Sequence, residues 1–464
     1  MPERRNVHRL TGTAAAAALV DLAGASVAAG AIARRRMVVG FLERRQADRR
    51  SVDRLRALRR DHGPGPVELV FPGRRFIVPL DPRDVGRILD ETPSPFHPAS
   101  WEKRRALEQF QPHAVLITRG PLRAPRRALN EAALDTPSEV HRLAEPFAAV
   151  IAEEAEVLAG EAIRSGTLTS AQFTEAWWRL VRRLVLGDAA RDDDAVTDDL
   201  WRLRKSGNWS FAAPTHTRRR ARFVERIYHY AEKAESDSLL GALANISVGG
   251  ELDPIGQLPH WLFAFDAAGM ATVRALALIA THPGVLDRCE TTEPGLPSLR
   301  PYLRACIQES VRLWPTTPAL LRETTEDTTW GEGSEQFTVG AGAGVLICVP
   351  AFHRDPDALP FADAFTPDIW IDGRAEGFPQ LVPFSAGPAR CPGQNVVLFA
   401  TSTFAAQVLS RLDLRLESSQ NLGPHAPLPV TLNQFGLRFG VRPAAARVGA
   451  RVGHLSGGAE REGI

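Results

Sequence analysis

Long apolar stretches with helical spacing dominate the pattern of hydrophobic positions along the chain. Residues 13–33 are rich in Ala and Gly, residues 177–186 are strongly apolar, and residues 259–281 are apolar on nearly every side. Pro259 suits the first turn of a helix. A helix that is apolar all round is typical of an element buried through the middle of a large domain. The pattern therefore predicts a mainly α-helical protein with one long central helix at residues 259–281.

Short β-rich stretches separated by turn residues predict small peripheral sheets rather than a large one. Val67–Phe71 and Arg75–Pro79 surround a Pro-Gly turn, and residues 320–325 have the composition of a further strand. Residues 337–339 and 345–349 flank a Gly- and Ala-rich stretch, which predicts that they pair as a hairpin.

Composition shifts divide the chain into three parts. We expect a helical N-terminal extension at residues 1–62, a single domain at residues 63–442 and a disordered tail at residues 443–464, which are rich in Ala, Gly and Arg. Asp21 disfavours a membrane span at residues 13–33. A signal peptide, or contact of the Arg34–Arg36 run with a membrane surface, are alternatives to a helix lying on the protein.

Charge and cysteine content narrow the choice of partners and compartment. The chain has 464 residues, of which 44% are hydrophobic, and a formal net charge of +2, which requires no nucleic-acid partner. Its four cysteines, Cys289, Cys306, Cys348 and Cys391, include no C-x-x-C pair. Neither a structural zinc site nor a disulfide framework is expected, and the cytosol is the default compartment.

The loop at residues 384–393 carries the clearest chemical signal. Cys391 stands just ahead of an apolar helical pattern, and the N–H groups and dipole of a helix N-terminus favour a thiolate. Gly387 and Gly393 bracket the cysteine and permit positive φ or close approach to a flat ligand. The loop is thus suited to present a thiolate to a metal in a planar cofactor. A buried structural cysteine between two turn glycines is the alternative.

This loop resembles the cysteine-ligand loop of the cytochrome P-450 family, whose pattern is F-x-x-G-x-R/H-x-C-x-G. Phe384, Gly387, Cys391 and Gly393 match the pattern. The family's Arg or His, which contacts a heme propionate, falls on Ala389, with Arg390 one place later. The resemblance implies heme b as the cofactor, with the thiolate of Cys391 as the axial iron ligand and Phe384, Gly387, Gly393 and Arg390 around it.

Within the predicted central helix, Ala268-Gly269-Met270-Ala271-Thr272 resembles the family's oxygen-side motif A/G-G-x-D/E-T. The resemblance implies that Ala268 and Gly269 border the cofactor and that the Thr272 hydroxyl steers protons to oxygen. Ala271 replaces the usual acid, so proton delivery would need Thr272 with water or a substrate group. Thr272 could instead be bonded only to its own preceding turn.

Three further segments are similar to the family in order and spacing. Glu309 and Arg312 match its buried E-x-x-R pair, Arg322 falls where a guanidinium contacts a heme propionate, and Ile369 replaces the third charged member of that pair's network. The basic residues of segment 119–134 match the position of a helix that faces the heme and the redox partner, without its Trp/His-x-x-x-Arg signature.

The resemblance implies the cytochrome P-450 fold, with heme between the long central helix and the cysteine loop. It also implies an oxidoreductase that inserts one atom of dioxygen into a small hydrophobic organic substrate. Similarity to soluble bacterial members suggests a cytoplasmic protein, without stable membrane insertion, that takes electrons from a ferredoxin-type donor and its reductase. A peroxide-driven or non-oxygenase heme-thiolate enzyme, a non-catalytic heme-binding protein and a helical scaffold without heme are the alternatives.

Overall fold

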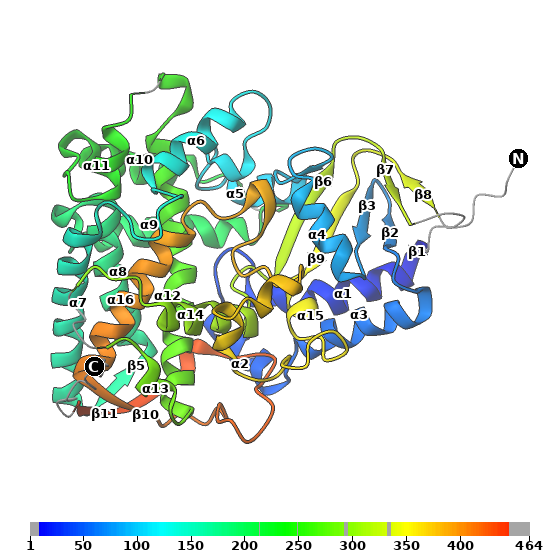
Figure 1. The fold of residues 1–464 in the computed structure, drawn as a ribbon. Coiled ribbons are helices and arrows are strands. Elements are labelled where there is room, and N and C mark those ends of the chain that lie inside the picture. The colour runs from blue at the N-terminus through cyan, green and yellow to red at the C-terminus, as the bar shows by residue number, and fades with distance from the viewer. Residues whose placement is uncertain (1–8, 213, 248, 292–295, 332–335, 445–464) are drawn as a thin grey trace, which may run out of the picture.

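The computed structural model describes residues 9–444 except 213, 248, 292–295 and 332–335. Helices fill one side of the molecule, and a six-stranded sheet with α1 and α3 forms the other side (Figure 1). Mainly helical architecture with small sheets was predicted and is confirmed. The predicted tail lies, from residue 445 on, outside the described residues.

The helical side is organised around α12 (Leu258–Thr281), which corresponds to the predicted central helix. It packs against α8, α14 and α16, and α16 also packs against α7. The core cluster of this side contains residues from each of these helices. Their bounds are α7 (Ala144–Ser165), α8 (Ser170–Leu186), α14 (Pro301–Leu313) and α16 (Gln394–Arg411).

The remaining helices are shorter or lie around this group. They are α4 (Pro82–Asp90), α5 (Trp101–Leu107), α6 (Arg123–Ala133), α9 (Asp194–Gly207), α10 (Thr217–Lys233), α11 (Leu239–Ala244), α13 (Val285–Arg288) and α15 (Val349–His353). Among the short 3₁₀ helices, η6 (Pro367–Trp370), η8 (Gly387–Ala389) and η9 (Gln434–Gly436) border the regions discussed below.

Both charged residues of α12 have partners inside the protein. Asp266 accepts from the Arg204 guanidinium at 2.6 Å, and Arg274 donates to the Trp314 carbonyl and to Gln434 Oε1. Because buried charges persist only when they are paired and hydrogen-bonded, these contacts explain how a nearly all-apolar core helix carries them.

Three small sheets surround the helices. The six-stranded sheet has the order β1-β2-β3-β9-β6-β4, the three-stranded sheet β10-β11-β5, and the two-stranded sheet β7-β8. The strands are β1 (Arg9–Thr11), β2 (Val67–Phe71), β3 (Arg74–Val78), β4 (Phe96–His97), β5 (Thr167–Thr169), β6 (Ala319–Thr324), β7 (Thr328–Trp330), β8 (Phe337–Val339), β9 (Gly344–Cys348), β10 (Leu412–Leu416) and β11 (Arg438–Pro443).

The predicted hairpin between residues 337–339 and 345–349 is wrong. β8 pairs with β7, whereas β9 pairs with β6 and β3 in the other sheet. All five residues of β9 are buried, so this strand fits the middle of the larger sheet. The Gly- and Ala-rich stretch therefore connects two sheets instead of closing a hairpin.

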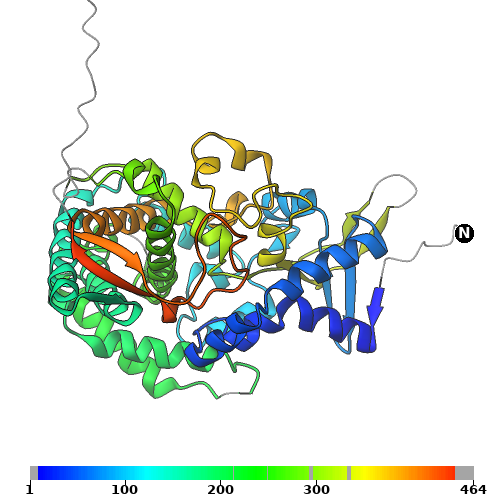
Figure 2. The same cartoon turned by 90° about the horizontal axis from the view of Figure 1, so that it is seen from below.

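The N-terminal helices lie against the six-stranded sheet, and the strand before them, β1, is part of that sheet. These are α1 (Gly12–Ala29), α2 (Arg36–Arg44) and α3 (Arg49–His62); α1 packs beside α3 (Figure 2), and β1 pairs with β2. Asp21 of α1 accepts from Arg54 of α3 at 2.7 Å. Two helical segments, Gly12–Ala29 and Gly250–Thr281, are long and apolar enough to cross a membrane, and the second is mostly buried in the protein.

Candidate functional site

The loop that carries Cys391 is a compact turn immediately before α16. The Cys391 amide donates to the Phe384 carbonyl at 2.9 Å, which closes the loop on itself. Ser385 and Gly387 have φ angles of 59° and 62°. Such left-handed residues let the chain reverse within a few positions, so the thiol is held at a defined place ahead of the helix.

Cys391 borders space inside the protein. Its side chain retains some accessible surface, although the residue lies deep in the fold. Burial raises the pKa of the Cys391 thiol, while the Gly393 N–H and the charges of Arg127 and Arg390 act to lower it. Among the described residues, no group of three or more His, Cys, Asp or Glu side chains could hold a metal ion. A metal at this loop would therefore be held by fewer than three such side chains of the described residues, Cys391 among them.

Three other residues predicted from this loop have packing or surface contacts. A Cβ on Gly387 would lie 2.1 Å from the Leu89 carbonyl oxygen, so close approach to α4 requires this glycine. A Cβ on Gly393 would meet only ordinary contacts at 3.7 Å. Arg390 is exposed, and its Nε donates to Gln394 Oε1 at 2.7 Å. The predicted contact of Arg390 with the cofactor is thus not favoured by its position.

Phe384 joins the cysteine loop to the central helix. It packs against a small buried cluster that contains Ala271 of α12, Leu398 of α16 and Val311 of α14. The Ser310 hydroxyl on α14 also donates to the Ala271 carbonyl at 2.9 Å. The two segments that the sequence associates with oxygen and with the thiolate therefore meet through direct side-chain packing.

The residues of the predicted oxygen motif do not all face the same way. Thr272 is fully buried, and its Oγ1 donates to the Ala268 carbonyl at 2.9 Å. A Cβ on Gly269 would lie 2.5 Å from Cδ1 of Trp177. The prediction that Gly269 leaves room beside the cofactor is corrected here, because the indole of α8 already takes that space.

One stripe of α12 remains partly accessible although the helix is packed on several sides. The stripe follows helical spacing and consists of His260, Phe263, Ala264, Asp266, Ala267 and Met270. Burial and the charge of Lys103 lower the pKa of His260 to about 4, so this imidazole is neutral at physiological pH. Its Nδ1 lies 3.1 Å from Gln111 Oε1. This stripe faces space inside the protein, in the half of α12 that precedes Thr272.

Positive charges gather beside the cysteine loop. Arg322 of β6 is buried and donates to Ser385 Oγ in the loop and to Thr92 Oγ1, each at 3.3 Å. Burial and the neighbouring Arg123 lower the pKa of Arg322 to about 10. The Nε of Arg123 is buried without a hydrogen-bond partner. Together with the buried Arg322, this atom makes the place beside the loop positive, which suits a bound anion.

The other arginines of the basic segment are already paired. Arg119 forms an ion pair with Glu323, Arg127 pairs with Glu131 at 2.5 Å, and Arg126 donates to Thr118 Oγ1 and to the Leu252 carbonyl. Arg127 also donates to the Arg390 carbonyl at 2.7 Å, which ties α6 to the cysteine loop. Within this segment, Arg123 is therefore the best candidate for contact with a bound anion.

The Glu309–Arg312 pair holds the segment that precedes the cysteine loop. Both side chains are fully buried, and Arg312 Nη2 lies 2.7 Å from Glu309 Oε1. Arg312 also donates to the carbonyls of His353, Phe361, Ala362 and Ala364. Ile369 stands where the family has a third charged residue that contacts this pair. In its place, Trp370 Nε1 donates to Glu309 Oε2 at 2.9 Å. Sequence analysis missed this replacement, because the tryptophan follows Ile369 at the next position.

His353 gives this region a pH-dependent stability. Its Nε2 accepts from the Val382 amide at 3.0 Å, and burial beside Arg312 lowers its pKa to about 3. Below a pH of about 6.5, His353 becomes protonated in the unfolded chain but stays neutral in the folded protein. Stability from the neutral ring is therefore present near neutrality and decreases with acid, by up to about 1.4 kcal/mol per pH unit.

We expect the urea midpoint of His353→Gln to depend less steeply on pH than that of the wild type between about pH 7 and pH 5. His97 and His260, whose pKa values are each lowered to about 4, contribute the same trend to both proteins and cancel in the comparison. The exposed His425→Gln is the control and should retain the full wild-type slope. Equal slopes for wild type and His353→Gln would contradict the prediction.

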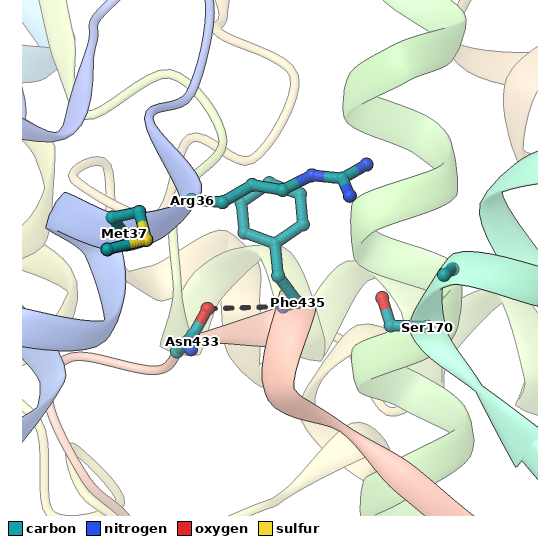
Figure 3. A pocket seen from close by; sticks show the side chains of 6 residues that line it. Arg36, Met37, Ser170, Asn433 and Phe435 are labelled. Atoms are coloured by element: carbon teal, nitrogen blue, oxygen red, sulfur yellow. Dashed lines mark hydrogen bonds between the residues drawn. The ribbon is translucent and has the colours of Figure 1, made fainter.

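A separate surface pocket of about 260 Å³ lies where α2, the start of α8 and η9 meet (Figure 3). Arg36, Met37, Ser170 and Phe435 line it, and the Arg36 guanidinium lies 5.2 Å from the centre of the Phe435 ring. None of the predicted site residues contributes to this pocket. The candidate site is therefore placed at the Cys391 loop and the accessible stripe of α12.

Comparisons with known proteins agree with this placement. A family model described as "Cytochrome P450" matches residues 270–434, which include Thr272, the Glu309–Arg312 pair and Cys391. "Probable cytochrome P450 4s3" of Drosophila melanogaster is 30% identical over 245 residues, 48% of each chain. "Cyclooctat-9-en-7-ol 5-monooxygenase" of Streptomyces melanosporofaciens is 33% identical over 178 residues, 34% of this chain and 38% of that protein.

A solved structure has the same fold. "Retinoic acid bound cyanobacterial CYP120A1" superposes with a TM-score of 0.67 at 18% identity, covering 84% of this chain and 94% of that one. The chain spans about half or less of the length of the curated relatives that it matches. The fold and the segment around the cysteine loop are thus shared with these proteins.

Proposed function

We propose that the chain is a heme-thiolate monooxygenase of the cytochrome P450 type, with Cys391 as the axial iron ligand; the family model over residues 270–434 and the shared fold support this. The observation that carries this proposal is the position of Cys391. Its thiol borders internal space, directly ahead of α16, in a loop whose Phe384 packs against Ala271 of α12. A merely structural cysteine would be packed on all sides and would not need this access.

The residues present fit a heme. Members of this family hold heme through a cysteine thiolate, and Cys391 is accessible for that bond. The cofactor also carries two propionates, and two guanidinium groups, the buried Arg322 and the half-buried Arg123, lie near the loop. Guanidinium groups suit carboxylates because their N–H groups match the two oxygens. We assign the propionates to Arg322 and Arg123.

When bound, the heme supplies the activation of dioxygen that introduces one oxygen atom into the substrate. The protein has to bind the substrate along α12, exclude bulk water and deliver protons. Thr272 is suited to the last task, because a hydroxyl has one donor and two acceptor sites and can pass a proton on. With Ala271 in place of an acid, the proton has to reach the Thr272 Oγ1 from water or from a substrate group.

Ala271 also favours a second candidate, a heme-thiolate enzyme driven by peroxide. Such an enzyme receives both oxygen and reducing equivalents in the peroxide, so it does not depend on an acid–alcohol pair for proton delivery. The buried neighbours of Ala271, Val311 and Leu398, are apolar and supply no proton. Turnover with peroxide alone, but not with dioxygen and an electron-transfer system, would favour this candidate over the monooxygenase.

The monooxygenase proposal predicts that Thr272→Ala uncouples electron use from product formation. Product formed per reduced nicotinamide consumed should fall about tenfold or more, because general acid–base contributions are typically at least that large. The Soret band with carbon monoxide should stay intact, and Thr272→Ser should recover much of the coupling. Unchanged coupling in Thr272→Ala would remove Thr272 from proton delivery.

We propose a ferredoxin-type electron donor with its reductase, and a cytoplasmic location. The exposed Arg390 and the adjacent Arg127 place positive charge next to the cysteine loop, where an acidic donor would dock. α1 is apolar enough to span a membrane, but Ala15, Ala18 and Leu22 are buried and Asp21 is paired with Arg54. These contacts support a helix that rests on the protein.

For the substrate we propose a small hydrophobic organic molecule. The accessible stripe of α12 offers Phe263, Ala264 and Ala267, which suit an apolar ligand. Of the two similar proteins above, the cyanobacterial one has retinoic acid bound, and the Streptomyces one is a cyclooctat-9-en-7-ol 5-monooxygenase.

A further inference from the structure

Lys103 of α5 is a deeply placed basic side chain whose hydrogen bonds go to backbone carbonyls. Its ammonium donates to the carbonyls of Pro98 at 2.7 Å and Leu321 at 3.2 Å. An ammonium has three N–H donors, so one remains after these two bonds. Glu102, the adjacent acid, is turned toward Arg74, with Nε and Oε1 2.7 Å apart. No ion pair joins Lys103 to a carboxylate in the part of the chain that the structure describes.

Lys103 lies between the accessible stripe of α12 and the two arginines near the cysteine loop, Arg123 and Arg322. Burial, Arg322 and Arg123 together lower the pKa of Lys103 well below its usual range. On the other side, Lys103 is the charge that contributes to the lowered pKa of His260. The Lys103 side chain is only partly buried although it lies deep in the fold, so it borders internal space.

Lys103 differs from Arg123 and Arg322 in that a heme propionate is not needed to account for it. Three basic side chains, the buried Arg322 and the partly buried Lys103 and Arg123, influence one another's pKa, and a heme brings two propionates. Arg322 is bonded to Ser385 of the cysteine loop, and α6, which carries Arg123, is tied to the loop by Arg127. The two arginines therefore account for the propionates. One positive charge is left over, on the side that faces His260.

An ammonium group that is removed from water without a counter-charge is destabilised, and a ligand carboxylate removes this cost. Gln111 is fully buried, and its Nε2 has no hydrogen-bond partner, which marks a further unused donor in the same neighbourhood. After His260 the accessible stripe is apolar at Phe263, Ala264, Ala267 and Met270, and its one acid, Asp266, is already paired with Arg204. One cation at the end of an apolar stripe matches a molecule with one acid group and a hydrocarbon body.

We propose that the substrate is an apolar monocarboxylic acid whose carboxylate is bound by the Lys103 ammonium. This inference rests on the proposed function, because it names the substrate class of that site. The acid group anchors one end of the molecule at Lys103, and the hydrocarbon body lies along α12 toward Ala267 and Thr272. Lys103 is thus a specificity-determining residue, and the carbon that is oxidised lies away from the carboxylate.

The test uses heme-loaded full-length protein and matched pairs of ligands, namely lauric, retinoic and cyclohexylacetic acid, each with its methyl ester. Binding is followed by the Soret shift of the heme. At least one acid should bind the wild type at least tenfold more tightly than its ester. Lys103→Met should weaken binding of that acid at least tenfold and leave the ester unchanged, and Lys103→Arg should retain part of the preference. Lys205→Met is the control, since Lys205 lies at the surface over the Trp201 ring.

Three results would overturn the inference alone. They are equal binding of every acid and its ester, no Soret shift with any acid, and a Lys103→Met variant that takes up less heme while its heme-loaded fraction keeps the acid preference. The last result would assign Lys103 to a propionate. A protein that takes up no heme, or gives no red-shifted Soret band with carbon monoxide, would overturn the proposed function and the inference with it.

Discussion

Replacing Cys391 with serine is expected to abolish the strongly red-shifted Soret band that carbon monoxide gives with the reduced, heme-loaded protein. That band requires a thiolate opposite the carbon monoxide, and the accessible thiol of the cysteine loop belongs to Cys391. Serine is nearly isosteric, so the turn closed by the residue 391 amide and the Phe384 carbonyl should persist. Monooxygenase turnover should fall by about a thousandfold or more, as when an activating ligand or nucleophile is removed.

The matched control is Cys289→Ser. Cys289 is buried, and its Sγ donates to the Val285 carbonyl at 3.4 Å, a contact that serine can reproduce. This variant should keep both the band and the activity. A Soret band that survives unaltered in Cys391→Ser would place the iron ligand elsewhere and end the proposed function.

Arg312→Met is expected to have the largest effect on stability. The change leaves the Glu309 carboxylate fully buried, with the Thr366 amide and the Trp370 indole as its remaining donors. Breaking a buried ion pair from one side typically costs about 3–5 kcal/mol. Since Arg312 also donates to four backbone carbonyls of the segment ahead of the cysteine loop, we expect little folded, heme-loaded protein, measured as the heme-to-protein ratio and the urea midpoint.

The double variant Glu309→Leu/Arg312→Met distinguishes two sources of this cost. A buried pair replaced by apolar residues often regains stability, because no unpaired charge remains. Here the four carbonyls would still lose their donor, so we expect only partial recovery. Full recovery would show that the ion pair alone, and not the carbonyl contacts, fixes the segment. Arg202→Met, at an exposed Asp198–Arg202 pair, is the surface control and should change the midpoint little.

Local sequence patterns predicted the elements that position the site. The nearly all-apolar run at residues 259–281 predicted the central helix, and α12 has nearly the same bounds because a helix packed on several sides needs apolar residues on those sides. The spacing of Glu309 and Arg312 predicted one shared face, and the pair is fully buried as expected. The loop pattern around Cys391 depends on turn residues within ten positions, which is why it can be recognised without tertiary information.

Only the tertiary structure decided which of these residues meet, and which others join them. The pairing of β8 with β7, and of β9 with β3 and β6, depends on which strand fits a buried sheet position, and nearness along the chain misled the hairpin prediction. Gly269 faces Trp177 because α8 crosses α12 there, and no pattern within the motif contains that fact.

The sequence by itself determined the long central helix, the Glu309–Arg312 pair and the position of Cys391 before a helix. Each of these depends on residues close together in the chain, through helical periodicity or turn-forming residues. The tertiary structure decided the charge balance around them. Lys103, Arg123, Arg322 and His260 come from four separate elements, and each alone is an ordinary polar residue. Their effect on one another depends on distance in space and on the removal of water, and neither is encoded in local spacing.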